Sequence, residues 1–495
     1  MRGARLPTAL LLALYLGSRL PALTLLPIFL DETTHIRWSV FIAQGEKLWR
    51  PWNYGKGLSV WLNALLFPWA MKEYLWASRA LVVAFGVLSL LGAVAIARRL
   101  FDLRTGLLAG VFYIVCPFAF FYDRLALTDA PMAAFGTLTL LASVQLAREP
   151  TLARGLLVAL TLVLTVLTKA AGMMLLAVPV LSVALLAQRR GKAWAALAGG
   201  LLGAALVLAY PLLRFQATTS TVRLGVEHHG GDLGARLLAN LEVSGEWLLV
   251  YFTAPLVVLG VLAVGFAIKE QSRPVLLLAV LAALPVLAFS AVASLWFPRY
   301  LVVVIVPGVV LAARGFARLT ASWPSGLSIA AMLLAIVPGL RVHHDLRTDP
   351  TRAALPDTDL GQFVFDWPSG YGTVGTLAFA REELRQHPEG ITIVAHSPSR
   401  RTSWLALGLE FADEPRVDLR DLDVSTRGAL DLLAAWARTK PTLLLVSPVG
   451  PAKTPPEPLS WAHLGARRLR SCKPDGGLCD LVYRLDYEPP QMQPP

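Results

Sequence analysis

Long apolar segments separated by short polar loops occupy the first two thirds of the chain. Nearly uncharged runs recur between Pro7 and Leu340, and each is close to the roughly 20 residues that a helix needs to cross a bilayer. The pattern predicts about eleven spans. We therefore expect a polytopic α-helical membrane protein over residues 1–340.

A polar segment over residues 31–76 follows the first span. It is too polar to cross a membrane, yet Trp38, Trp49, Trp52 and Trp61 lie among leucines within it. Aromatic residues at this density are typical of helices that lie between lipid and water. The segment is therefore predicted to be an amphipathic loop at the outer membrane surface.

A different pattern begins at Arg341, where charged residues, proline and glycine become frequent and no span-length apolar run remains. Helix-like and strand-like segments alternate, which favours a small α/β domain over residues 341–487. The predicted elements are helices over residues 373–386 and 425–438 and strands over 391–395, 442–446 and 481–485. The proline-rich residues 488–495 are predicted to be disordered.

The distribution of charge indicates topology. The formal net charge is +12, but the basic residues lie in short loops between spans and not along one face, so we expect no nucleic-acid partner. These loops recur on one side of the predicted spans and contain Arg98/Arg99, Arg148/Arg154, Arg189/Arg190/Lys192, Lys269/Arg273 and Arg314/Arg318. The positive-inside rule makes that side and the N-terminus cytoplasmic and the α/β domain extracytoplasmic. Without a convincing cleavage site, the first apolar segment is expected to remain as span one.

The cysteines bear on the compartment of the C-terminal domain. Cys472 and Cys479 flank a short turn that could close a small disulfide loop, while Cys116 lies in an apolar run. A bridge would suit an oxidising, extracytoplasmic domain. Two free thiols are the alternative.

Carboxylates occur at the ends of spans on the predicted outer side. Asp31 and Glu32 directly follow the first span, and Asp129 precedes Pro131 at the start of a later one. An acid at the water boundary costs far less than one at mid-membrane. The structural alternatives are a polar stop after the first span for the acid pair, and a helix N-cap for Asp129.

Lysines occur on the same side. Lys56 lies between Gly55 and Gly57, where the backbone can approach another group closely, so it is a candidate phosphate ligand. Lys169 is the only charge between Arg154 and Arg189, and a lipid phosphate is a natural partner for it. The alternatives are a surface loop lysine for Lys56 and a lysine that extends to the headgroups for Lys169.

Carboxylates and cations together suit sugar transfer from a polyprenyl phosphate. An acceptor hydroxyl loses its proton as it attacks the anomeric carbon, and the departing lipid phosphate gains charge that fixed cations stabilise. One displacement of this kind inverts the anomeric centre.

Several short motifs, in this order, resemble membrane glycosyltransferases of the GT-C fold. The chain looks like the branch that contains protein O-mannosyltransferases and lipid A aminoarabinose transferases. The motifs are Asp31-Glu32, Tyr54-x-Lys56 with Trp61-Leu62, Arg124-Leu125-Ala126-Leu127-Thr128-Asp129, Thr168-Lys169 and Pro298-Arg299-Tyr300.

The resemblance implies roles for individual residues. Asp31 would be the catalytic base with Glu32 assisting, and Asp129 the second site carboxylate. Donor phosphate would be bound by Lys56, with Lys169, Arg299 and Tyr300 sharing that task.

The chain also departs from the family pattern. Gly57-Leu58 stands where relatives often have prolines, and Asp123 is an additional acid without an assigned place. Bacterial relatives also have, just after the membrane part, a segment like Asp366-Trp367-Pro368-Ser369-Gly370-Tyr371-Gly372. The sequence assigns no role to this segment. Some relatives bind a metal through the first acid motif, but two adjacent carboxylates without a recognisable third ligand do not require one. A divalent metal therefore stays open here without being implied, and no other cofactor is expected.

The sequence thus predicts an inverting glycosyltransferase on the outer face of a bacterial cytoplasmic membrane. Its donor would be a polyprenyl-phosphate sugar, and its acceptor a hydroxyl of lipid A, protein or a glycan. A transporter or flippase for a lipid-linked or anionic substrate is the alternative, but it would place its charges near the midplane of broken, repeated helices. A scaffold whose tail binds a partner is a third class.

Overall fold

The computed structural model describes residues 5–67, 69–215, 233–293, 295–396, 402–424, 426, 428–447 and 467–485. They divide into two compact units. The helical unit comprises Met1–Leu23, Trp38–Trp69 and Trp76–Pro356, and the mixed unit comprises Thr24–Arg37, Ala70–Leu75 and Asp357–Pro495. Residues 488–495, for which disorder is predicted, lie outside the described ranges.

Seven of the described helices are long and apolar enough to cross a membrane, and four shorter helices are also apolar. The long ones are α5 (Tyr74–Leu100), α8 (Asp129–Arg148), α11 (Arg190–Arg214), α13 (Leu233–Glu270), α14 (Arg273–Val292), α15 (Ile305–Leu319) with the 3₁₀ helix η5 (Pro298–Val304), and α16 (Ser325–Thr348). The shorter ones are α1 (Arg5–Arg19), α6 (Leu103–Val115), α9 (Leu152–Thr168), and α10 (Ala177–Leu186) with the 3₁₀ helix η3 (Ala170–Leu176). The predicted polytopic helical class is confirmed, and the count of about eleven spans stays a prediction.

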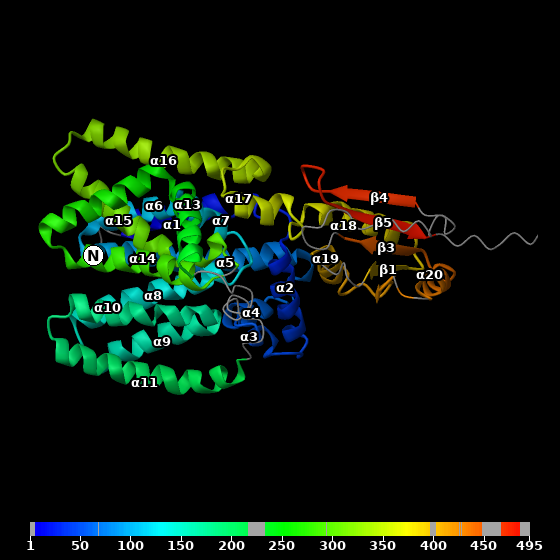
Figure 1. The fold of residues 1–495 in the computed structure, drawn as a ribbon, viewed down its shortest axis with the longest axis horizontal. Coiled ribbons are helices and arrows are strands. Elements are labelled where there is room, and N and C mark those ends of the chain that lie inside the picture. Colours follow the sequence, from blue (N-terminus) through cyan, green and yellow to red (C-terminus); the bar gives the residue numbers. More distant parts are fainter. Residues whose placement is uncertain are drawn as a thin grey trace, which may run out of the picture. The chain divides into compact units, whose positions relative to one another are not determined.

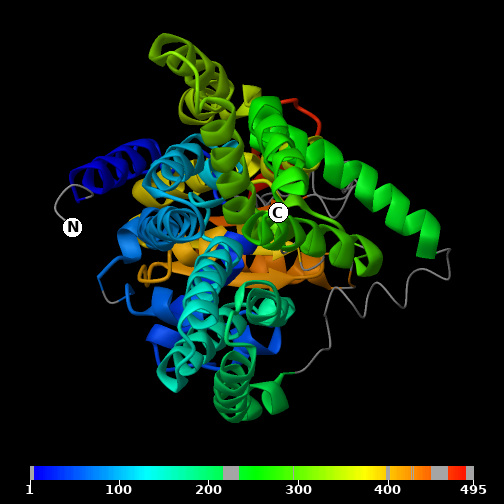
Figure 2. The same cartoon turned by 90° about the vertical axis from the view of Figure 1, so that its left-hand side faces the viewer.

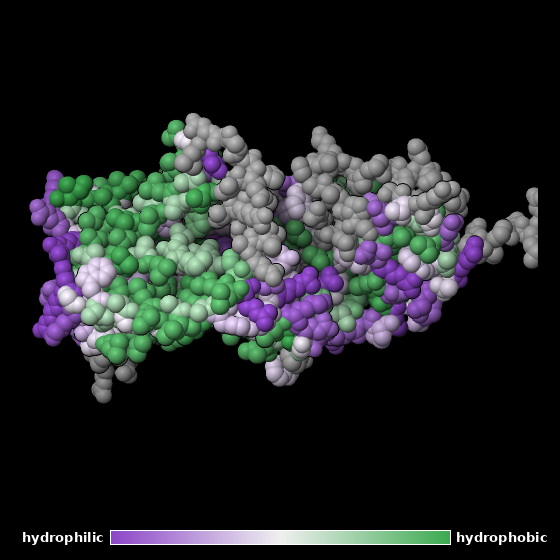
Figure 3. Space-filling model, turned by 60° about the horizontal axis from the view of Figure 1, so that its bottom comes forward, coloured by the Kyte–Doolittle hydropathy of each residue, from purple (hydrophilic) through white to green (hydrophobic). Residues whose placement is uncertain are grey.

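The long helices differ in how much of their surface the protein covers. In α8 and in η5 with α15, 78% of the apolar window is buried, against 28% in α11 and 17% in α16. Figure 1 and Figure 2 both show α11 and α16 at opposite edges of the helical unit. On the face drawn in Figure 3, apolar residues cover most of the helical unit next to a hydrophilic rim at the left-hand end. Such a surface suits contact with lipid chains.

Polar contacts join several predicted cytoplasmic loops at one end of the helical unit. Arg314 lies 3.9 Å from Asp102 and 3.7 Å from Glu270. Arg104 also donates a hydrogen bond to Thr320 at 2.8 Å. These loops after α5, α13 and α15 therefore share one side, as the charge pattern predicts.

Short helices form the predicted amphipathic loop and its surroundings. They are α2 (Leu30–Ala43), α3 (Arg50–Asn53), α4 (Leu58–Ala64), η2 (Met71–Glu73) and, before α8, α7 (Pro117–Tyr122). Trp69 is 84% exposed, as an interfacial residue would be. Trp52 is instead fully buried, and its Nε1 donates to the Pro211 carbonyl at 2.5 Å. Trp52 is therefore a core residue and anchors α3 to α11.

The mixed unit contains a five-stranded sheet with the order β2-β1-β3-β5-β4. Strands β2, β1 and β3 are parallel, and β5 pairs antiparallel with both β3 and β4. Their bounds are β1 (Ile391–His396), β2 (Val417–Leu422), β3 (Thr442–Val446), β4 (Arg467–Cys472) and β5 (Cys479–Leu485). Helices α17 (Asp357–Leu360), the π-helical η7 (Gly361–Phe365), α18 (Tyr371–Gln386), α19 (Thr402–Glu410) and α20 (Ala429–Ala437) complete it.

Alternate strand residues form the core of this unit. Val394, Leu444 and Leu481 pack with Leu433 of α20, and α18 packs on β4, β5 and α19. The predicted α/β architecture of the tail is confirmed, although α20 begins at Ala429, after Gly428, whose φ is +84°. A disulfide joins Cys472 to Cys479 across β4 and β5, so the bridge is the alternative that the structure supports.

Candidate functional site

An ion pair between Asp129 and Lys169 lies at the centre of the candidate site. Asp129 is the first residue of α8, and Lys169 follows the last residue of α9 in an extended conformation. The Lys169 ammonium lies 2.5 Å from Oδ1 of Asp129, with 13% and 5% of the two side chains exposed. Thr128 occupies the N-cap position, so Asp129 is not the N-cap, and its carboxylate instead holds Lys169.

Lys56 lies beside Lys169 through a short backbone pairing. The two residues form an isolated antiparallel β-bridge, with hydrogen bonds from Gly57 N–H to the Thr168 carbonyl at 3.2 Å and from Ala170 N–H to the Gly55 carbonyl at 2.8 Å. Directly opposed residues of an antiparallel pair present their side chains on the same face. The geometry therefore brings both lysines to one face.

The glycines flanking Lys56 allow this approach. Gly55 has a φ of +69°, and a Cβ on Gly57 would lie 2.7 Å from the Leu167 carbonyl oxygen. The close neighbour that the glycine pattern indicates is thus the backbone at the C-terminal end of α9.

Tyr300 and Arg299 enter from η5. The Lys169 ammonium lies 5.0 Å from the centre of the Tyr300 ring, a cation–π distance. The Arg299 guanidinium lies 4.7 Å from the Phe297 ring and 5.9 Å from the Tyr300 ring. We refer to Lys56, Asp129, Lys169, Arg299 and Tyr300 as the basic cluster, in which three cations accompany one carboxylate.

An apolar pocket begins one helical turn from this cluster. It lies between α8, η3 with α10, α14 and η5 with α15, and its lining includes Ala133, Leu140, Leu175, Leu284 and Val303. Ala133 follows Asp129 by four residues, and Ala133 to Leu140 spans about 10 Å along α8. The pocket therefore lies beside α8, starting one helical turn after Asp129.

Asp31 and Glu32 lie in the first turn of α2, in the mixed unit. Asp31 is half-buried. Glu32 is fully buried, and its Oε2 accepts a hydrogen bond from Phe29 N–H at 3.0 Å. This is the return bond of a capping box, which satisfies one of the free N–H groups at a helix start.

The structure also reveals a buried polar network that the sequence prediction missed. Asp123 accepts hydrogen bonds from Tyr15 at 2.9 Å and Tyr113 at 3.1 Å, and Nε of Arg19 lies 4.0 Å away. Arg19 also donates to the Ile114 carbonyl at 2.7 Å. The signal was Arg19 within one apolar segment and Asp123 directly after another. The network binds α1 to α6 and to the turn after α7.

Within the described ranges, no three His, Cys, Asp or Glu side chains converge as a metal site would require. The candidate site is instead a charged cluster beside an apolar pocket. Such an arrangement can bind an anionic head with an apolar tail.

Comparisons with known proteins bear on the fold. Residues 58–213 match the model of the dolichyl-phosphate-mannose-protein mannosyltransferase family, whereas no curated protein matches the sequence. The fold is similar to ArnT from Cupriavidus metallidurans, with a TM-score of 0.57 in the apo state and 0.55 bound to undecaprenyl phosphate. Both comparisons give 15% identity and cover 97% of each chain.

A second similar structure is the apo oligosaccharyltransferase of Archaeoglobus fulgidus, with a TM-score of 0.51 and 12% identity over 90% of this chain and 69% of that one. These identities establish the fold. The resemblance predicted from the motifs is thereby confirmed: residues 58–213 match the mannosyltransferase family, and the chain has the GT-C fold of membrane glycosyltransferases.

Proposed function

We propose that this protein is an inverting glycosyltransferase that moves a sugar from a polyprenyl phosphate to an acceptor hydroxyl. The observation that carries the proposal is the basic cluster one helical turn from an apolar pocket. A polyprenyl-phosphate donor has the matching parts, an anionic head and a long apolar chain. The ArnT structure bound to undecaprenyl phosphate supports the same ligand class.

In this reaction the acceptor oxygen attacks the anomeric carbon while the bond from that carbon to the phosphate oxygen breaks. The electron pair of that bond stays on the phosphate, and the hydroxyl proton passes to Asp31 as general base. Lys56, Lys169, Arg299 and Tyr300 bind the phosphate as its charge grows. A single displacement inverts the sugar.

Two acids support these groups. Asp129 is the second site carboxylate, and its ion pair orients the ammonium of Lys169. Glu32 assists the base by fixing the first turn of α2 through Phe29.

The positions of the charges favour an enzyme over a transporter or flippase. Asp129 starts α8 and Lys169 follows α9, so the ion pair lies at helix ends, whereas transport sites lie near the midplane of broken helices. We place the site on the outer face of a bacterial cytoplasmic membrane, opposite the basic loops. Lipid A, a protein or a glycan would then be the acceptor.

The test uses purified protein in nanodiscs, supplied with undecaprenyl phosphate carrying mannose or aminoarabinose and with each acceptor class. Release of undecaprenyl phosphate coupled to acceptor glycosylation is expected for one combination. Asp31→Asn is expected to abolish it, while Glu73→Gln, an exposed acid of η2, should leave it unchanged. Full turnover by Asp31→Asn would refute the base assignment, and absence of transfer from every donor would refute the activity.

Phosphate binding is tested separately with undecaprenyl phosphate alone. Lys56→Met removes a charge-assisted contact worth about 1.5–3 kcal/mol, which weakens affinity roughly 10–100-fold. Lys72→Met changes an exposed lysine of η2 and should not alter affinity. Equal affinity of wild type and Lys56→Met would remove Lys56 from the phosphate site.

A further inference from the structure

One segment after the predicted membrane part contacts the start of the helix that carries Asp31. We call Asp366–Gly372 the collar. Its Pro368 carbonyl accepts hydrogen bonds from Leu30 N–H and from Thr402 Oγ1, both at 3.1 Å. The first N–H groups of a helix have no partner within the helix, so the collar supplies one for α2.

The collar also fits the backbone just before α2. A Cβ on Gly370 would lie 2.1 Å from the Ile28 carbonyl oxygen, so only glycine allows this approach without a backbone shift. The centre of the Phe29 ring lies 4.4 Å from that of Phe363, three residues before the collar. The entry into α2 is therefore fixed by a backbone contact and a ring contact in addition to the hydrogen bond.

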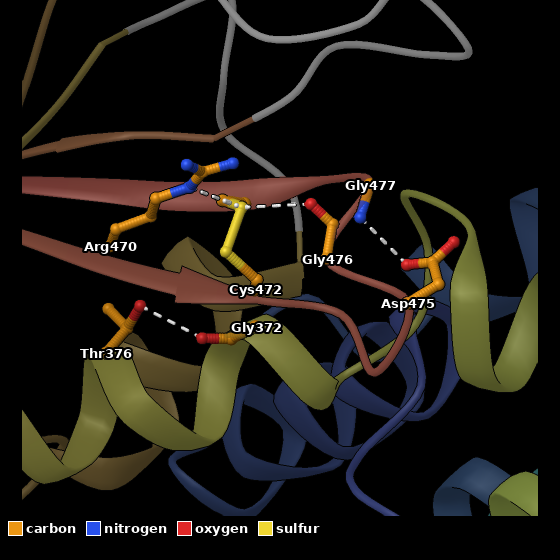
Figure 4. Close-up of a disulfide and its surroundings, with 8 residues drawn as sticks. Gly372, Thr376, Arg470, Cys472, Asp475, Gly476 and Gly477 are labelled. Carbon is orange, nitrogen blue, oxygen red and sulfur yellow. Dashed lines mark hydrogen bonds between the residues drawn. A yellow bond between two sulfur atoms is a disulfide. The ribbon is translucent and has the colours of Figure 1, made fainter.

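The β4–β5 hairpin holds the other side of the collar. Lys473, only 6% exposed, donates from its ammonium to the Ser369 carbonyl. Its backbone N–H donates to the Leu478 carbonyl at 2.9 Å inside the turn that the Cys472–Cys479 bridge closes. Figure 4 shows this bridge and turn beside the first turns of α18, whose first two residues, Tyr371 and Gly372, end the collar.

We propose that the collar is a positioning element for Asp31, held in place by Lys473 of the disulfide-closed hairpin. This inference rests on the proposed function, because it takes Asp31 as the base. Pro368 and Leu30 join the collar to the residue immediately before Asp31. The C-terminal domain thus contributes to the reaction by holding the base carboxylate in its productive orientation.

Small displacements of a catalytic group have large effects on rate. A misplacement of about 1 Å lowers turnover roughly 100-fold, whereas substrate affinity depends on other contacts. A helix N-terminus also stabilises a nearby carboxylate. Loosening the first turn of α2 should therefore lower kcat and move the acidic limb of the pH–kcat profile to higher pH.

The experiment compares Gly370→Ala with Gly361→Ala. A Cβ on Gly361 would meet nothing within 4 Å, so this matched change should behave as wild type. Gly370→Ala is expected to lower kcat roughly 10–100-fold, with affinity for undecaprenyl phosphate alone within twofold of wild type. Hydrogen exchange over residues 28–34 should rise in Gly370→Ala only.

Lys473→Met tests the other side of the collar if Gly370→Ala does not fold. It should show the same loss of kcat and the same rise in exchange, and Lys473→Arg should restore part of both. Wild-type kcat and pH profile in folded Gly370→Ala or Lys473→Met, with Asp31→Asn inactive, would overturn the collar proposal alone. An active Asp31→Asn would instead overturn the base assignment and, with it, the positioning role.

Discussion

The Asp129–Lys169 pair gives the sharpest test of the helical unit. Its two side chains are 5% and 13% exposed, and the charged atoms are 2.5 Å apart. Removing one partner of a buried pair leaves an uncompensated charge, which destabilises by about 3–5 kcal/mol. Asp129→Asn and Lys169→Met alone should each lower stability by that amount.

The double variant Asp129→Asn/Lys169→Met separates structure from function. It removes both charges together with the free energy needed to bury them, so it should recover most of the lost stability. If the pair belongs to the catalytic site, this stable variant still loses sugar transfer. Stability is followed by thermal unfolding in nanodiscs and transfer by release of undecaprenyl phosphate.

A matched control exists at the opposite end of the same two helices. Glu149 pairs with Arg154, but its side chain is 73% exposed, so Glu149→Gln should change stability by less than about 1 kcal/mol. Single variants of Asp129 or Lys169 as stable as wild type would refute the buried-pair reasoning. A double variant with wild-type transfer would refute the catalytic assignment and leave the structural one intact.

Three further predictions follow from the pocket and the mixed unit. Gly136→Leu places a side chain in the apolar pocket and should weaken binding of undecaprenyl phosphate at least tenfold. Gly245→Leu, on an exposed face with open space, should leave binding unchanged. Equal affinities of Gly136→Leu and wild type would exclude the pocket as the lipid site. The double variant Cys472→Ser/Cys479→Ser removes the bridge. Because the bridge closes a loop of eight residues in the unfolded chain, its loss should lower the free energy of unfolding of the mixed unit by about 2.5 kcal/mol, which thermal unfolding against the oxidised protein measures. Burial lowers the pKa of Lys473 below its ordinary value of 10.5, although nearby carboxylates oppose this shift. Between the lowered pKa and pH 10.5 the unfolded chain binds more protons than the folded one, so the free energy of unfolding should rise with pH in that range. Lys473→Met should flatten that rise.

The sequence predicted the interior of the mixed unit better than its edges. Strands β1, β3 and β5 contain apolar runs such as Leu443–Leu445 and are buried in the sheet. Strands β2 and β4 were missed because they are the two edge strands. Edge strands carry charged residues that discourage pairing with other chains, and these charges hide the strand pattern.

The helical unit shows a similar division. Composition predicts the apolar spans, because a membrane demands uncharged helices. It does not predict where a span breaks. Helix α13 breaks at Thr253, which has a φ of +63° and lies two residues before Pro255. Such breaks depend on packing between helices, which one segment of sequence does not contain.

Within the site, sidedness was predictable and contact was not. Positive-inside counting places Lys56, Asp129 and Lys169 on one side, and the structure brings these three together. The bridge that aligns the two lysines needs Gly55 and Gly57 to meet the backbone at the end of α9 and just beyond it. Glycines flanking a lysine signal a close approach, but only the fold identifies the approaching group.

Buried charge in a membrane protein is commonly taken as functional, and two ion pairs of the helical unit show where that inference needs geometry. The carboxylate of Asp123 is surrounded by Tyr15, Tyr113 and Arg19, which hold a turn between helices. Lys169 and its partner instead lie at helix ends beside an apolar pocket. Because a reacting lipid phosphate needs both a cation and a place for its chain, the neighbouring pocket, and not burial of charge alone, separates the candidate site from the structural pair.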